Sequence, residues 1–144
     1  IVKDPTDSIF GHAALEEVVT VGSVGIDTPY LISPDSSQGP VTIRIPEPSR
    51  RWKPDICAPT NVQVSGAGSF PVPFPGTSAA APHVAGVIAQ LLSSFPDVSR
   101  DDLIKALYSN AFDLGEPGWD PTYGYGLIDA VKAFQYLLES RNIG

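Results

Sequence analysis

The sequence of 144 residues contains no methionine and a single cysteine, Cys57. One cysteine excludes an internal disulfide and a metal site built from several cysteines. Because Cys57 stands between Ile56 and Ala58, we expect its thiol to be buried as a small apolar side chain. A chain without methionine has no initiator residue, so we expect an excised or processed piece of a longer protein. No apolar run reaches the roughly 20 residues that a membrane-spanning helix needs, so the sequence indicates no membrane span.

Basic residues are also scarce, since nine lysines and arginines stand against sixteen aspartates and glutamates, for a net charge of −7. This balance argues against nucleic acid as a partner. The basic cluster RRWK at residues 50–53 is short, and we expect it to lie in a solvated loop. Fifteen prolines and thirteen glycines, separated by apolar runs in a chain that is 42% hydrophobic, indicate a loop-rich globular fold.

Hydrophobic patterns predict strands in the first half of the chain and helices in the second. The β-branched run 18–24 predicts a strand buried on both faces of a parallel sheet. The alternation of apolar and polar residues at 41–45 predicts a strand with one solvent-exposed face. One helix starts near residue 78; Ser99 and Asp129 each predict the start of another. The apolar positions of the three helices are Val84, Val87, Ile88, Leu91 and Leu92; Leu103, Ala106 and Leu107; and Val131, Phe134 and Leu138. We expect the first two helices to bury theirs.

The segment 76–86 reads GTSAAAPHVAG and places Ser78 between a glycine-bearing turn and the first turn of a helix. A hydroxyl there lies beside free backbone N–H groups and the positive end of the helix dipole, which would stabilise an oxyanion formed on its target. Ser78 is therefore a candidate nucleophile for acyl transfer. Spacing alone also allows the plainer interpretation that the serine or threonine only caps the helix.

This segment resembles the serine motif G-T-S-x-A-x-P-H-V-A-G of the subtilisin-like serine peptidases, or subtilases, at every specified position. Four further segments match the family in its own order: VVTVGSV at 18–24, SSQGP at 36–40, KPDICAP at 53–59 and YGYGLID at 123–129. The resemblance implies an α/β fold, specifically the C-terminal half of a subtilisin-like three-layer fold with a mainly parallel sheet flanked by helices. It also implies a serine endopeptidase that forms an acyl-enzyme on Ser78.

The family's catalytic aspartate and histidine and its oxyanion-hole asparagine have no matching segments in this sequence. His12 and His83 are the two histidines present, and neither lies in the H-G-T-x-V-A-G context of the family's catalytic base. His83 belongs to the serine motif, where the resemblance implies that its side chain packs and does not transfer a proton. We therefore expect residues 1–144 to be the C-terminal part of a catalytic domain whose other catalytic segments lie upstream. Alone the chain should be inactive, and its expected partners are peptide substrates and the missing N-terminal half.

The resemblance also implies roles for residues around Ser78. Gly76 and Thr77 would form the nucleophile turn, with the Thr77 hydroxyl either supporting the oxyanion or, as we expect, capping the helix. Phe74 borders the leaving-group side of the family's cleft and either contacts substrate or only anchors its loop. Gly11 and His12 fall where the family lines part of its specificity pocket.

No cofactor is expected. Related peptidases sometimes hold a weak cation near the segment of Asp55, but one carboxylate is far short of the six to eight oxygens that calcium takes. Calcium in the full-length enzyme cannot be assigned to residues of this chain. Cellular location stays open, although the resemblance favours export. Two alternatives remain: a noncatalytic subtilase-like binding or structural module of a larger protein, and a cut chain that acts with an N-terminal fragment held noncovalently.

Overall fold

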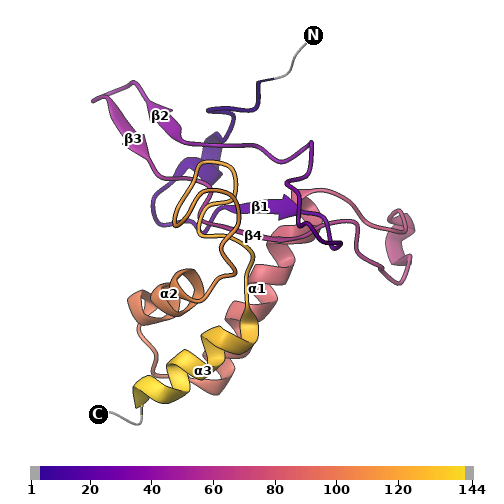
Figure 1. Ribbon diagram of the computed structural model, residues 1–144, viewed down its shortest axis with the longest axis vertical. Coiled ribbons are helices and arrows are strands. Elements are labelled where there is room, and N and C mark those ends of the chain that lie inside the picture. The colour runs from indigo at the N-terminus through magenta and orange to yellow at the C-terminus, as the bar shows by residue number, and fades with distance from the viewer. Residues whose placement is uncertain (1–3, 142–144) are drawn as a thin grey trace.

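The computed structural model describes residues 4–141 (Figure 1). Short strands occupy the first half of these residues and long helices the second. The strands are β1 (Val21–Val24), β2 (Val41–Ile43), β3 (Ser49–Arg51) and β4 (Ile56–Pro59), and the helices are α1 (Thr77–Ser94), α2 (Arg100–Ser109) and α3 (Ala130–Arg141), with 3-10 turns at Gly11–Ala14 and Ala67–Ser69.

Strands β1 and β4 form the parallel pair on which the rest of the fold is built. Their register runs from Val21 opposite Ile56 to Val24 opposite Pro59. Three of the four residues of each strand are buried, as a strand covered on both faces requires. The strand is shorter than the predicted range 18–24, and Val18 is exposed. The prediction of a parallel strand is confirmed for its second half.

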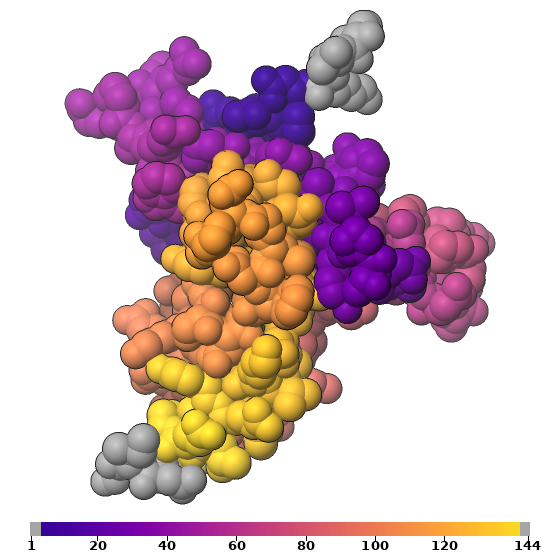
Figure 2. Space-filling view, viewed as in Figure 1, coloured from indigo at the N-terminus to yellow at the C-terminus, as the bar shows by residue number. Residues whose placement is uncertain are grey.

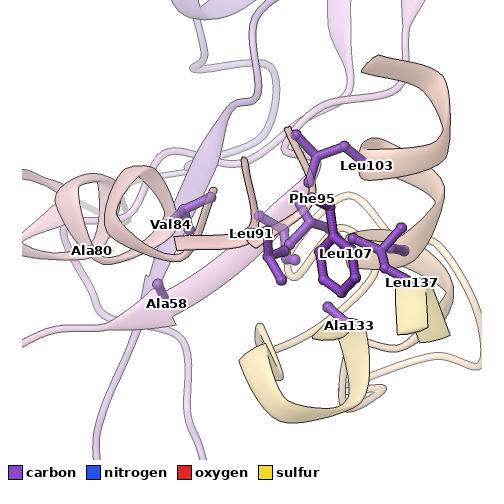
Figure 3. Close-up of a cluster of buried hydrophobic side chains, with 11 residues drawn as sticks. Ala58, Ala80, Val84, Leu91, Phe95, Leu103, Leu107, Ala133 and Leu137 are labelled. Carbon is purple, nitrogen blue, oxygen red and sulfur yellow. The ribbon is translucent and has the colours of Figure 1, made fainter. Parts of the chain in front are cut away.

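Helix α1 packs against both strands of this pair, and its first residues lie near the end of β1 to which the arrow points (Figure 1). Ala80, Val84 and Leu91 face the core (Figure 3). Val87 and Ile88 are half-buried. Leu92 is 42% exposed, so the prediction that it belongs to the buried stripe is wrong. Helical periodicity alone is compatible with Leu92 at the edge of the apolar face. Among the described residues, however, none packs over the Leu92 side chain.

Helices α2 and α3 pack on each other beside the last turns of α1 (Figure 1). Both predicted starts are confirmed: Ser99 Oγ accepts the N–H of Asp102 at 3.1 Å, and Asp129 Oδ1 accepts the N–H of Lys132 at 2.9 Å. Helix α2 buries Leu103, Ala106 and Leu107 as predicted. Helix α3 instead buries Ala133 and Leu137 and exposes the three apolar residues singled out in its sequence, Val131, Phe134 and Leu138.

Strands β2 and β3 form an antiparallel hairpin that stands away from the body of the molecule (Figure 2). The predicted alternation over 41–45 is confirmed only for 41–43, where Val41 is buried and Thr42 exposed. The strand ends at Ile43, and Ile45 is 83% exposed, so its predicted place on the covered face is wrong. The basic cluster at 50–53 is not a solvated loop throughout, because Arg51 lies on β3 and Lys53 is only 2% exposed. Lys53 is buried because it pairs with the carboxylate of Asp55, as described below.

These elements confirm an α/β fold with a parallel sheet and packed helices. Cys57 is fully buried, as predicted. Among residues 4–141, no helix combines the length and apolar character that crossing a bilayer would take.

Candidate active site

Ser78 is the second residue of α1, and its side chain is exposed. The helix begins where the two parallel strands end, since Thr60 follows β4, donates its N–H to Val24 at the end of β1, and accepts the N–H of Gly76 on its hydroxyl at 2.6 Å. The carboxyl end of a parallel sheet is where α/β proteins commonly place their ligand sites. The fold therefore presents Ser78 to solvent at a position suited to chemistry.

The turn before Ser78 depends on Gly76. Its φ of 85° and ψ of 176° lie in a region that side-chain-bearing residues rarely adopt, and a Cβ there would lie 3.3 Å from Asp35 Oδ2. Gly76 is the N-cap of α1 and no side chain caps the helix. The prediction that Thr77 caps it is wrong, because Thr77 already lies inside the first turn.

Two backbone donors are available beside the Ser78 hydroxyl. The first N–H groups of α1 with a helical acceptor are those of Ala79 and Ala80, which both bond the carbonyl of Gly76. The N–H groups of Thr77 and Ser78 come before them and have no helical acceptor. An anion forming next to Ser78 would meet these donors and the positive end of the helix dipole.

Neither histidine is hydrogen-bonded to Ser78 within residues 4–141. His83 lies one turn further along α1, and its Nδ1 is 2.6 Å from the carbonyl oxygen of Ala79. Since a carbonyl can only accept, Nδ1 carries the hydrogen and that bond holds the ring. His12 is exposed in the turn Gly11–Ala14. A base that removes the proton of Ser78 is thus not in place among the described residues.

A pocket of about 170 Å³ borders the start of α1 and includes Thr77 in its wall. Phe10 and Ala13, which flank the predicted residues Gly11 and His12, also line it, together with Thr20. Gly11 and His12 themselves are exposed and are not part of this lining. The structure therefore brings their segment to the serine turn through their neighbours.

A second pocket, of about 370 Å³, includes Ala79 in its wall and is almost wholly apolar. Phe74 lines it and packs edge-on against Phe70, with ring centroids 5.1 Å apart. The backbone of Phe74 exchanges two hydrogen bonds with Val62, of 2.8 and 3.1 Å. Phe74 thus anchors its loop and also faces an open space next to the nucleophile turn, so the two predicted roles are compatible.

Asp55 lies at the opposite, amino end of the parallel pair, directly before β4, and Lys53 neutralises its charge. The two side chains are joined at 2.7 Å, and Asp55 Oδ2 also accepts the N–H of Thr20 at 2.7 Å. Burial and, second, the negative charge of Asp55 raise the pKa of Tyr108 well above its usual range. Within the described part of the chain, no three His, Cys, Asp or Glu side chains come together as metal ligands.

Sequence reasoning missed three residues near the serine turn: Thr60, Phe10 and Thr20. Thr60 directly follows the KPDICAP segment, and its contact with Gly76 spans 16 residues. No local pattern signals such a contact, because it depends on how the strand end and the helix start meet in space.

Comparisons with known proteins agree on one family. The model of the Subtilase family matches residues 3–126. Fervidolysin of Fervidobacterium pennivorans is 43% identical over 75 residues, which cover 52% of this chain and 11% of fervidolysin. The subtilisin-like protease SBT6.1 of Arabidopsis thaliana is 32% identical over 128 residues, which cover 84% of this chain and 12% of that protein. The chain thus spans about a tenth of the length of these relatives.

Solved structures give the same result for the fold. The protease CspB of Clostridium perfringens superposes with a TM-score of 0.69 at 25% identity, over 92% of this chain and 29% of that one. A lanthipeptide protease superposes with a TM-score of 0.64 at 26% identity, over 88% of this chain and 43% of the other. Both superpositions cover most of this chain and less than half of the larger protein.

Proposed function

The chain belongs to the subtilase family, and from this premise we propose that it supplies the nucleophile of a serine endopeptidase. The observation that carries the proposal is the position of Ser78, exposed on the first turn of α1 at the carboxyl ends of β1 and β4. In this proposal Ser78 Oγ attacks the carbonyl carbon of a peptide bond, and the resulting oxyanion accepts the N–H of Ser78.

The proton of Ser78 needs an acceptor from outside this chain. Neither His12 nor His83 is bonded to Ser78, so we assign the base, its orienting aspartate and a second oxyanion donor to residues upstream of residue 1. The base would take the hydroxyl proton during attack and give it to the leaving amine, and water would then release the acyl group. In subtilisin, a relative, removing the serine or the base alone lowers turnover about 10⁶-fold. The 144-residue chain should therefore be inactive by itself.

The substrate would lie across the start of α1 with a pocket on each side. The pocket walled by Thr77, near Gly11 and His12, would take a side chain on the acyl side. The pocket walled by Ala79 and Phe74 would face the leaving-group side. Peptides fit this arrangement because an extended chain places side chains on both sides of the bond to be cut.

The missing half of the domain would cover the face of α1 turned away from β1 and β4. That face carries small residues that are exposed here, among them Ala81, Ala85 and Gly86, and a Cβ on Gly86 would meet nothing within 4 Å. Small side chains allow another backbone to approach closely. We therefore propose that residues 1–144 are the C-terminal part of the catalytic domain.

Peptide hydrolysis by three proteins tests the proposal: the 144-residue chain, the gene product extended upstream of Ile1, and the extended protein with Ser78→Ala. A matched control is Ser94→Ala, which removes another exposed serine from α1. We expect cleavage by the extended protein and by its Ser94→Ala variant, and none by the other two. Peptide binding without cleavage by the extended protein would instead support a noncatalytic binding module.

A further inference from the structure

Thr60 connects the end of the parallel pair to the start of the serine helix. It is 1% exposed, and its N–H donates to Val24 at 2.9 Å, which continues the pairing of β1 and β4 by one residue. Its hydroxyl oxygen accepts the N–H of Gly76 at 2.6 Å. This side chain therefore ties the turn to the end of the parallel pair, in addition to the backbone bonds between Val62 and Phe74 that hold the residues before the turn.

Gly76 is held at both of its backbone groups. Its N–H is bound by Thr60, and its carbonyl accepts the N–H groups of Ala79 and Ala80. Because Gly76 has a positive φ and no side chain, little else in its own structure resists rotation of the turn. The orientation of the next two residues, Thr77 and Ser78, consequently depends on the bond to Thr60 together with the packing of α1 on β1 and β4.

We propose that Thr60 is a positioning residue for Ser78, acting through Gly76. Its hydroxyl keeps the turn in the orientation in which Ser78 Oγ faces the reacting carbonyl and the N–H of Ser78 faces the oxyanion formed there. Thr60 itself touches no substrate. The inference rests on the proposed function, since it assigns Thr60 a part in the attack by Ser78.

Replacing Thr60 by valine keeps the shape and removes the acceptor. The N–H of Gly76 would then be left without its partner, a state that proteins avoid, and the turn would move to find another. Small displacements of a nucleophile slow a reaction strongly, about 100-fold for roughly 1 Å. Serine at the same position retains the hydroxyl and should retain most of the rate.

The test uses the extended protein and a fluorophosphonate probe that reacts with an activated serine. The rate constant of labelling, kinact, and the concentration for half-saturation, KI, are measured well below each variant's midpoint of thermal unfolding. We expect Thr60→Val to lower kinact about tenfold or more, with KI within about twofold and Thr60→Ser close to wild type. Ser99→Ala is the matched control, because Ser99 also accepts a backbone N–H at a helix start. It should lower the unfolding midpoint and leave kinact unchanged.

The outcomes separate the two proposals. If wild type is labelled and Thr60→Val reacts at the same kinact, the role of Thr60 is overturned and the proposed function stands. Equal slowing by Thr60→Ser and Thr60→Val would also overturn it, because the hydroxyl would not be responsible. If wild type is not labelled at Ser78, the proposed function fails and the role of Thr60 fails with it. Should Thr60→Val not fold, Thr60→Ala provides the same comparison.

Discussion

The ammonium of Lys53 lies 2.7 Å from Asp55 Oδ2 in the interior of the protein, with side chains only 3% and 12% exposed. Lys53 Nζ also donates to the carbonyl of Val18 at 2.6 Å, while Asp55 Oδ2 accepts the N–H of Thr20 at 2.7 Å. The pair thus ties the residues that lead into β1 to those that lead into β4. Its bonds fix the start of the parallel pair, as Thr60 fixes its end.

Breaking this pair should destabilise the fold strongly. Lys53→Met leaves a buried carboxylate without its counter-charge, and we expect the free energy of unfolding to fall by about 3 kcal/mol. Asp101→Asn is the control, because Asp101 pairs with Arg100 at 3.8 Å on an exposed surface, where screening by solvent makes the change small. Urea unfolding followed by circular dichroism measures both. Similar losses in the two variants would refute a structural role for the buried pair.

Alkaline pH should reveal the burial of Cys57. Burial and, second, the charge of Asp120 raise the pKa of the Cys57 thiol from 9.0 to about 12. Between these values the unfolded chain loses a proton that the folded chain keeps, so the free energy of unfolding falls as pH rises, by at most about 1.4 kcal/mol per pH unit. Below pH 9 the thiol is protonated in both states and contributes no slope.

Cys57→Ala provides the comparison for this pH dependence. Its free energy of unfolding should fall less steeply between pH 9 and 12 than that of wild type, by the equivalent of one proton. Titration of lysines and tyrosines affects both proteins alike. Parallel slopes in urea unfolding across this range would contradict the raised thiol pKa.

Two leucines from the helices should differ in their effect on stability. Leu107 on α2 is 1% exposed and belongs to the main core, whereas Leu138 on α3 is 46% exposed. We expect Leu107→Ala to cost about 2 to 5 kcal/mol, because it leaves a cavity, and Leu138→Ala to cost less than about 1 kcal/mol. Thermal unfolding of the two variants checks this order. A larger loss at Leu138 would show that something packs on the exposed face of α3.

Replacing Gly86 by leucine should have opposite effects in the 144-residue chain and in the extended protein. In the 144-residue chain a Cβ at position 86 would meet no atom within 4 Å, and Gly86→Leu removes a glycine from a helix interior, so we expect stability to rise by about 0.5 to 1 kcal/mol. In the extended protein the same side chain would obstruct the proposed N-terminal half and prevent labelling of Ser78. Lys105→Leu, on the exposed side of α2, should be tolerated in both. Normal labelling of the extended Gly86→Leu protein would argue against coverage of this face.

Features encoded within a few residues could be predicted from the sequence. The start of α2 follows from Ser99 and Asp102, because the Ser99 hydroxyl accepts the N–H of Asp102 and donates to its carboxylate. The parallel strand β1 follows from its β-branched run. The sequence also predicts the start of α1 at the correct turn. Its N-cap is Gly76 and not Thr77. Gly76 has a positive φ and no side chain to bond the helix, so the usual signal of a capping side chain is missing there.

Features that join distant segments could not be predicted in this way. Lys53 reads as part of a basic, solvated cluster, yet it is buried, because its ammonium bonds the carbonyl of Val18, 35 residues earlier in the chain, as well as the nearby carboxylate of Asp55. The periodicity of α3 marks Val131 and Phe134 as apolar but does not say which face meets the core. Thr60 carries no local signal at all. In each case the deciding contact depends on tertiary packing.

Labelling by a fluorophosphonate, located by mass spectrometry, shows whether Ser78 is an activated nucleophile. The 144-residue chain, the protein extended upstream of Ile1 and the extended Ser78→Ala variant are treated side by side. If Ser78 is the nucleophile, the extended protein is labelled stoichiometrically at Ser78 and the other two are not labelled. Absence of labelling in a folded extended protein would contradict the claim that Ser78 is an activated nucleophile.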